Sequence, residues 1–118
     1  MFKERLETIA SRLEGARLVA LIAADGIPVE VHRQDEDLDV EALAAELVTQ
    51  VRSIAENHDE LTLGSVRQLS ITTDRQTLML GALGGGHFLL LVLRDGVSSG
   101  RARFELRRAP LVLDSDLE

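Results

Sequence analysis

Hydrophobic residues along this chain follow helical and strand-like spacings in turn. The first apolar positions are spaced by four, three and four residues, at Phe2, Leu6, Ile9 and Leu13. That spacing predicts a short helix with one apolar stripe. Residues 18–24 are apolar throughout, and the pair Asp25-Gly26 separates them from a second run at 27–33. An Asp-Gly pair between two such runs predicts a β-hairpin. The first of these strands should be central in its sheet, while Pro28 should keep the second at an edge.

A longer helix is predicted over residues 40–57, because its apolar positions cover a wide arc. Asp39 stands at the N-cap position, and Leu38 and Leu43 have the spacing of a hydrophobic staple. An arc this wide can face a sheet and touch a neighbouring helix as well.

Three further strands are predicted at residues 66–73, 77–83 and 87–94. Asp74-Arg75 should form the turn between the first two, and the glycine triplet 84–86 the turn between the last two. The segment 95–99 leads into a final helix, which Pro110 should end.

The predicted order is therefore helix, two strands, helix, three strands, helix. Hairpin-length connections make most of the sheet antiparallel. We expect an α/β three-layer sandwich with five strands, the long helix on one face and the first and last helices on the other. Residues 1–110 would form one domain, and residues 111–118 a short acidic tail.

Composition narrows the choice of partners. The net charge is −7 and aromatic residues make up 3% of the chain, so a nucleic-acid partner is not expected. The chain has no cysteine, which excludes disulfides and thiolate metal sites. Its first residues are too densely charged for a signal peptide, and its longest apolar runs are too short to cross a bilayer. We expect a cytoplasmic protein with no membrane insertion.

One short motif suggests catalysis. Residues 96–100 match the G-x-S-x-G nucleophile elbow and lie between a strand and a helix. A hydrolase triad of that type needs a histidine after the serine, but the last histidine is His87. Ser98 or Ser99 is better explained as the N-cap of the last helix. We therefore predict no catalytic residue and no enzymatic activity.

Metal and cofactor patterns are also incomplete. Asp35, Asp37, Asp39 and Glu46 approach the spacing of a calcium loop, but Val40 stands where that loop requires glycine. The three histidines, His32, His58 and His87, lack metal-ligand spacing, and no P-loop occurs. We predict no metal site and no bound cofactor.

Three surface features suggest protein contacts. Arg101, Arg103, Arg107 and Arg108 form a basic patch on the last helix, which suits either the helix dipole or a partner. Small residues line one side of the long helix at Ala42, Ala45, Thr49 and Ser53. They would let another helix approach closely, but alanine is also simply a good helix former. The strand at 66–73, if it lies at a sheet edge, could pair with a second copy across a two-fold axis.

These features together resemble the Roadblock/LC7 domain family, and above all its stand-alone bacterial MglB-like members. The resemblance covers about residues 2–109. It rests on the order of elements and on four local sequences: Ala24-Asp25-Gly26, Asp74-Arg75, Leu80-Gly81-Ala82-Leu83, and Gly100-x-Ala102-Arg103-x-x-Leu106-Arg107-Arg108-Ala109.

The resemblance implies a Roadblock/profilin-like fold and a homodimer whose sheets join through the third strand, with the long helices side by side. Its implied dimer interface comprises Ala45, Val48, Arg52, Ala55, Val66, Leu69, Ile71 and Thr73. It also implies a small Ras-like GTPase as partner, contacting Glu46, Gln50, Ser53 and Glu56. MglB-like members activate GTP hydrolysis without inserting an arginine, by remodelling the GTPase so that its own residues complete the site. The chain after Pro110 is short, so contacts made by a longer tail are not implied here.

The resulting hypothesis is a dimeric, non-catalytic regulator or scaffold of a small Ras-like GTPase. The alternative is a small-ligand sensor on the same fold, with the glycine triplet 84–86 as its binding loop, or an assembly scaffold without a GTPase. The sequence leaves open which GTPase is bound, whether the effect is activation, exchange or tethering, and whether a paralogue replaces the second copy.

Overall fold

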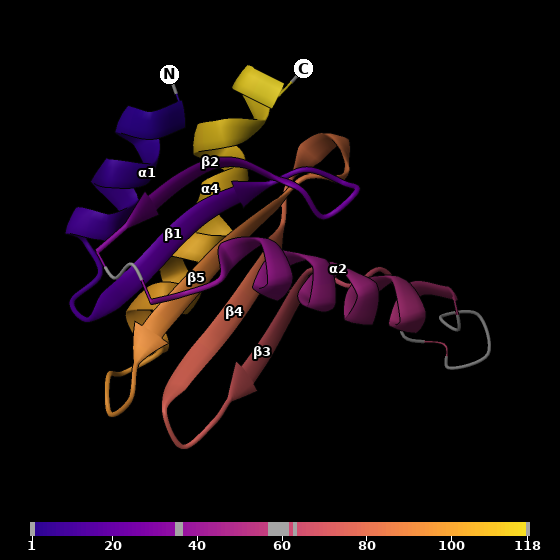
Figure 1. The fold of residues 1–118 in the computed structure, drawn as a ribbon. Helices are drawn as coiled ribbons and strands as arrows, with labels where there is room; N and C mark the ends of the chain where they lie inside the picture. The colour runs from indigo at the N-terminus through magenta and orange to yellow at the C-terminus, as the bar shows by residue number, and fades with distance from the viewer. Residues whose placement is uncertain (1, 35–36, 57–61, 63, 118) are drawn as a thin grey trace.

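The computed structural model describes residues 2–34, 37–56, 62 and 64–117. The elements follow one another in the predicted order (Figure 1). Their bounds are α1 (Phe2–Ser11), β1 (Ala16–Ile22), β2 (Pro28–Arg33), α2 (Val40–Glu56), β3 (Gln68–Thr72), β4 (Gln76–Ala82), the 3₁₀ turn η1 (Gly84–Gly86), β5 (Phe88–Arg94) and α4 (Gly100–Leu117).

The five strands form one antiparallel sheet in the order β2-β1-β5-β4-β3. The Asp25-Gly26 hairpin is confirmed, because the Gly26 N–H donates to the Ala23 carbonyl at 2.8 Å and the Ile27 N–H donates to Asp25 Oδ1 at 3.1 Å. Strand β2, which begins at Pro28, lies at one edge as predicted. Strand β3 lies at the other edge.

Helices cover both faces of the sheet and complete the predicted three layers. Helix α2 lies on one face, and α1 and α4 lie on the other (Figure 1). Alternation along the central strands supplies both cores. In β5, Leu89 and Leu91 are buried with α1 and α4, whereas Leu90 and Val92 are buried with α2. Successive side chains of a strand point to opposite faces, so a nearly continuous apolar strand can serve two cores.

The start of α2 is capped as predicted. Asp39 Oδ1 accepts a hydrogen bond from the Ala42 N–H at 3.1 Å, and the Asp39 carbonyl accepts one from the Leu43 N–H at 3.0 Å. Leu38 and Leu43 are both half-buried and pack against the core beneath α2. The helix therefore begins directly after its N-cap residue, Asp39.

The prediction that Pro110 ends the last helix is wrong, because α4 continues through it to Leu117. Proline inside a helix removes one hydrogen bond and costs about 3 kcal/mol. Packing beyond the proline offsets this cost. Leu113 is 0% exposed, and Val112 and Leu117 pack against the same core. Asp114 Oδ1 also accepts a hydrogen bond from the Gly84 N–H at 2.8 Å.

Strand β3 is shorter than predicted, and Val66 and Thr73 lie outside it. The Thr73 hydroxyl oxygen instead accepts hydrogen bonds from the N–H groups of Arg75 and Gln76, both at 3.1 Å. These bonds stabilise the predicted Asp74-Arg75 turn. The first helix likewise ends at Ser11, and Leu13 is buried just beyond it.

Candidate functional site

The two edges of the sheet differ in their resistance to pairing with another strand. Strand β2 has the sequence PVEVHR and carries a proline and charged side chains. Strand β3 has the sequence QLSIT, with neither a proline nor a charged residue. Within the described part of the chain, β3 pairs with β4 alone, so its outer edge presents unpaired backbone groups. Charges and proline are the usual means of blocking an edge strand, so β3 is the edge open to pairing.

Leu69 and Ile71 connect this edge to the layer above it. Both side chains are half-buried and pack against the core beneath α2. The alternating residues Gln68, Ser70 and Thr72 are exposed on the opposite face. Leu43 of α2 packs against the same core. We call β3 together with Leu43 and Ile54 of α2 the β3–α2 surface.

Two of the predicted dimer residues lie on the other side of α2, beside the β1–β2 hairpin. A Cβ atom built on Gly26 would lie 3.5 Å from the Ala45 Cα atom. The Arg52 guanidinium donates a hydrogen bond to the Ala24 carbonyl of the same hairpin. Because the hairpin belongs to the β2 side of the sheet, Ala45 and Arg52 are not brought together with β3.

The remaining predicted dimer residues are placed in three ways. Val48 is 1% exposed and belongs to the core between α2 and the sheet. Ala55 and Val66 do come together, in a hollow of 290 Å³ at the end of α2. Thr73 is exposed in the turn after β3.

Leu43 and Ile54 are two interface candidates that the sequence pattern does not predict. Both are half-buried side chains of α2. Successive residues of an α-helix turn by about 100°, so these two lie nearly opposite Ala45 and Arg52 on the helix. They therefore face the β3 side of the sheet. The helical wheel contained this signal, but choosing between the two flanks required knowing which edge each flank overlooks.

The four predicted GTPase-contact residues, Glu46, Gln50, Ser53 and Glu56, are all exposed on α2. Gln50 Nε2 donates a hydrogen bond to Glu46 Oε1 at 3.2 Å, one helical turn away. With Glu41, also exposed, the helix presents three carboxylates against one basic residue, Arg52. The outer face of α2 is therefore acidic and complements a basic surface.

The glycine triplet is held in place by the end of α4. The Gly84 N–H already donates to Asp114, and a Cβ on Gly84 would lie 3.0 Å from Asp114 Cγ. Gly85 and Gly86 have φ values of 67° and 78°, which favour glycine. The Gly84 N–H, which a ligand-binding loop would offer to its ligand, is thus already hydrogen-bonded within the chain.

The candidate catalytic and metal residues have local structural roles. Ser98 Oγ lies 3.4 Å from the Gly100 N–H at the start of α4, and the Ser99 carbonyl accepts the Arg103 N–H. Asp39 caps α2, while Asp35 and His58 lie outside the described residues. No group of three or more metal-ligating side chains converges among the residues described. In the same part of the chain, none of the helices is long and apolar enough to cross a membrane.

Comparison with known proteins identifies the fold. Neither a protein-family model nor a curated protein sequence matches the chain. Among solved structures, a Roadblock/LC7 domain from Streptomyces avermitilis matches with a TM-score of 0.83 and 18% identity, covering 95% of this chain and 93% of that one. The gliding protein MglB from Thermus thermophilus matches with a TM-score of 0.84 and 19% identity, covering 95% and 84%. An MglB structure with a tetrameric arrangement gives the same values.

MglC from Myxococcus xanthus has a higher identity of 27%, with a TM-score of 0.69 and 96% coverage of both chains. These likenesses extend over nearly the whole length of each protein. The chain therefore has the Roadblock/LC7 fold, as its sequence predicted.

Proposed function

We propose that this chain, which has the Roadblock/LC7 fold, is a dimeric, non-catalytic regulator or scaffold of a small Ras-like GTPase. The observation that carries the proposal is the β3–α2 surface. It combines an uncharged, unpaired edge strand with half-buried apolar side chains of the neighbouring helix. A second copy would satisfy the backbone groups of the edge and bury these side chains in one step.

The dimer contacts are proposed to centre on Leu69 and Ile71 of β3, with Val66 before the strand and Leu43 and Ile54 on α2. All five are half-buried apolar residues in the single chain. Partly exposed apolar side chains next to an open edge are what a homodimer interface buries. Strand pairing across a two-fold axis would also bring the two α2 helices side by side.

The GTPase is proposed to contact the acidic outer face of α2, at Glu46, Gln50, Ser53 and Glu56. Two such helices in a dimer would double the acidic surface. Arg52, the one basic residue of α2, is engaged with the Ala24 carbonyl. This supports a mode of activation in which no arginine from this helix is inserted into the GTPase, as the family resemblance implies.

The proposal is tested by capture of GTPases from the native cytosol on the immobilised protein, with GDP and with a non-hydrolysable GTP analogue in parallel. Preferential capture of a Ras-like GTPase with the analogue is expected, followed by faster GTP hydrolysis when the purified pair is mixed. Glu46→Arg should weaken capture at least about tenfold, since reversing one charge in a close interfacial pair costs more than about 1.4 kcal/mol.

Glu7→Arg is the matched control, because Glu7 is an exposed carboxylate on α1, outside the proposed surface. It makes the same change in net charge and should leave capture unchanged. Absence of a Ras-like GTPase in both nucleotide states would overturn the proposal. The protein would then be an assembly scaffold without a GTPase partner.

A further inference from the structure

The carboxylate of Glu105 is buried without a full set of hydrogen bonds. Glu105, on α4, is 1% exposed and is the one polar or charged residue among the buried side chains of the described chain. Its Oε1 atom has no hydrogen-bond partner among the described residues. Burying a carboxylate is unfavourable unless hydrogen bonds replace those it made to water. The proposed dimer and GTPase surfaces do not use this group.

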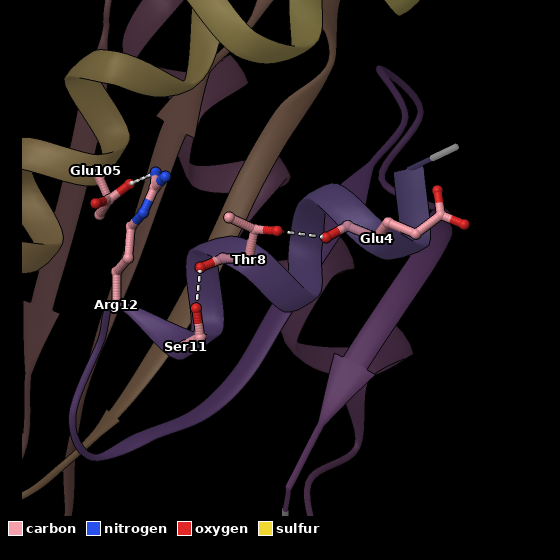
Figure 2. Close-up of polar contacts among 5 residues, drawn as sticks. All are labelled: Glu4, Thr8, Ser11, Arg12 and Glu105. Carbon is pink, nitrogen blue, oxygen red and sulfur yellow. Dashed lines mark hydrogen bonds and ion pairs between the residues drawn. The ribbon is translucent and has the colours of Figure 1, made fainter.

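The ion pair that Glu105 makes is a loose one. Arg12 follows α1 and reaches across to α4, where its Nη1 atom lies 3.8 Å from Glu105 Oε2 (Figure 2). That separation is longer than a hydrogen bond. The Arg12 side chain is 33% exposed and lines the space between the helices. Its remaining donors are available to a group bound there.

The nearby hydroxyl groups of Thr8 and Ser11 do not donate hydrogen bonds to Glu105 either. The Thr8 hydroxyl donates to the Glu4 carbonyl at 2.9 Å, and the Ser11 hydroxyl donates to the Thr8 carbonyl at 2.7 Å. Figure 2 shows both bonds running along α1 itself. Neither hydroxyl group therefore donates to the buried carboxylate.

That space is a cleft of 130 Å³ between α1 and α4, which we call the α1–α4 cleft. Glu105 lines it together with three arginines, Arg5, Arg12 and Arg108. Even without Arg5, the two guanidinium groups of Arg12 and Arg108 exceed the single carboxylate of Glu105, which gives this lining a positive surplus. A molecule that fits must offer a hydrogen-bond donor to the buried carboxylate and negative charge to the arginines around it.

The remaining lining is apolar at Ile9, Ala109 and Val112, and it includes Thr8, whose hydroxyl is bonded within α1. The volume is small for a nucleotide or for the side of a partner helix, but suits a compact molecule with a short aliphatic chain. An α-amino acid is the simplest compound that joins an ammonium group to a carboxylate at short distance. A second carboxylate on its side chain would use the positive surplus.

We propose that the α1–α4 cleft binds a free acidic α-amino acid, with its ammonium group donating to Glu105 and its carboxylates paired with Arg12 and Arg108. An ammonium group has three donors, and a guanidinium can hold a carboxylate through two parallel hydrogen bonds. The site is on the opposite face of the sheet from α2. It can therefore be tested on the protein alone, and its failure would leave the GTPase proposal unaffected.

The test is thermal unfolding and isothermal titration of the full chain with L-glutamate and L-aspartate at millimolar concentration. At least one amino acid should raise the unfolding midpoint in proportion to the logarithm of its concentration, because it binds only the folded state. Glutarate, which keeps both carboxylates of glutamate but lacks the ammonium group, should bind at least about tenfold more weakly.

Two cleft variants and one control complete the design. Glu105→Gln and Arg108→Gln should each lower the affinity about tenfold or more, with folding checked by circular dichroism. Arg103→Gln removes an exposed arginine of the same helix outside the cleft and should leave binding unchanged. The proposal is overturned if neither amino acid binds, if glutarate binds as tightly as glutamate, or if both folded cleft variants retain wild-type affinity.

Discussion

Single residues fix the start of α2 and the turn after β3. Asp39 holds the start of α2 with its carboxylate and its carbonyl, and Thr73 organises the turn after β3 with one hydroxyl. Such contacts join residues two to four positions apart. They can be predicted from sequence, because a cap or a turn depends on a short stretch of chain and hardly at all on what packs around it.

Removing the cap should have a measurable cost. Asp39→Ala is expected to lower the free energy of unfolding by about 1 kcal/mol, because the Ala42 N–H loses its acceptor. Thermal unfolding followed by circular dichroism would show this as a midpoint lower by several degrees. Asp39→Asn keeps an acceptor oxygen and should retain most of the stability. If Asn proved as harmful as Ala, the charge at the helix terminus would be the stabilising feature instead of the cap.

The burial of Glu105, in contrast, cannot be predicted from neighbouring residues in the sequence. Glu105 lies in the segment RFELRR, whose charged residues predict an exposed helix surface. Its burial depends on α1 lying beside α4, a contact between segments from opposite ends of the chain. The same holds for Arg52, whose partner Ala24 is 28 positions away. No local pattern carries such information.

Among the elements, α4 shows how packing overrides a local breaker. Its second half continues beyond Pro110 because one side is buried against the core and against the η1 turn. Leu113 lies on that side and is 0% exposed, whereas Leu111 is 86% exposed. Helix propensity is a weak local preference, and the burial of a few apolar side chains outweighs it.

Two leucine substitutions would separate packing from propensity in this segment. Leu113→Ala should destabilise the protein by about 2–5 kcal/mol, because it leaves a cavity in the core. Leu111→Ala makes the same chemical change on the exposed side and should stay within about 0.5 kcal/mol of the wild type. Urea unfolding of both variants gives the comparison. Similar values for the two would mean that residues 111–117 do not pack on the domain in solution.

For the whole molecule, the central question is what covers the β3 edge. A lone chain with an uncharged edge strand is prone to uncontrolled association, and a closed two-fold dimer removes that hazard. The opposite edge at β2 is already blocked by Pro28 and its charged neighbours. Because only the β3 edge is open to pairing, this asymmetry favours a closed β3-to-β3 dimer over repeated edge-to-edge association of sheets.

Lysine substitutions at the two edges test this asymmetry. The double variant Ser70→Lys with Thr72→Lys places like charges across the proposed axis and should convert the proposed dimer to a monomer of about 12.9 kDa. Val29→Lys puts a lysine at an exposed position on the β2 edge and should leave the dimer intact. Light scattering after size-exclusion chromatography measures the mass directly. A monomeric wild type, or a dimer that survives the double variant, would contradict the model of β3 pairing.

The sequence by itself determined the kind and order of the elements, the Asp25-Gly26 hairpin, the cap of α2 and the position of β2 at an edge. These features follow from spacing, turn residues and missing donors, all of which act over a few positions. Tertiary structure alone decided where α4 ends, which flank of α2 overlooks β3, and that Glu105 is buried in a cleft among arginines. Each of these depends on which distant segments lie side by side, and that arrangement is set by the shared burial of apolar faces from the whole chain.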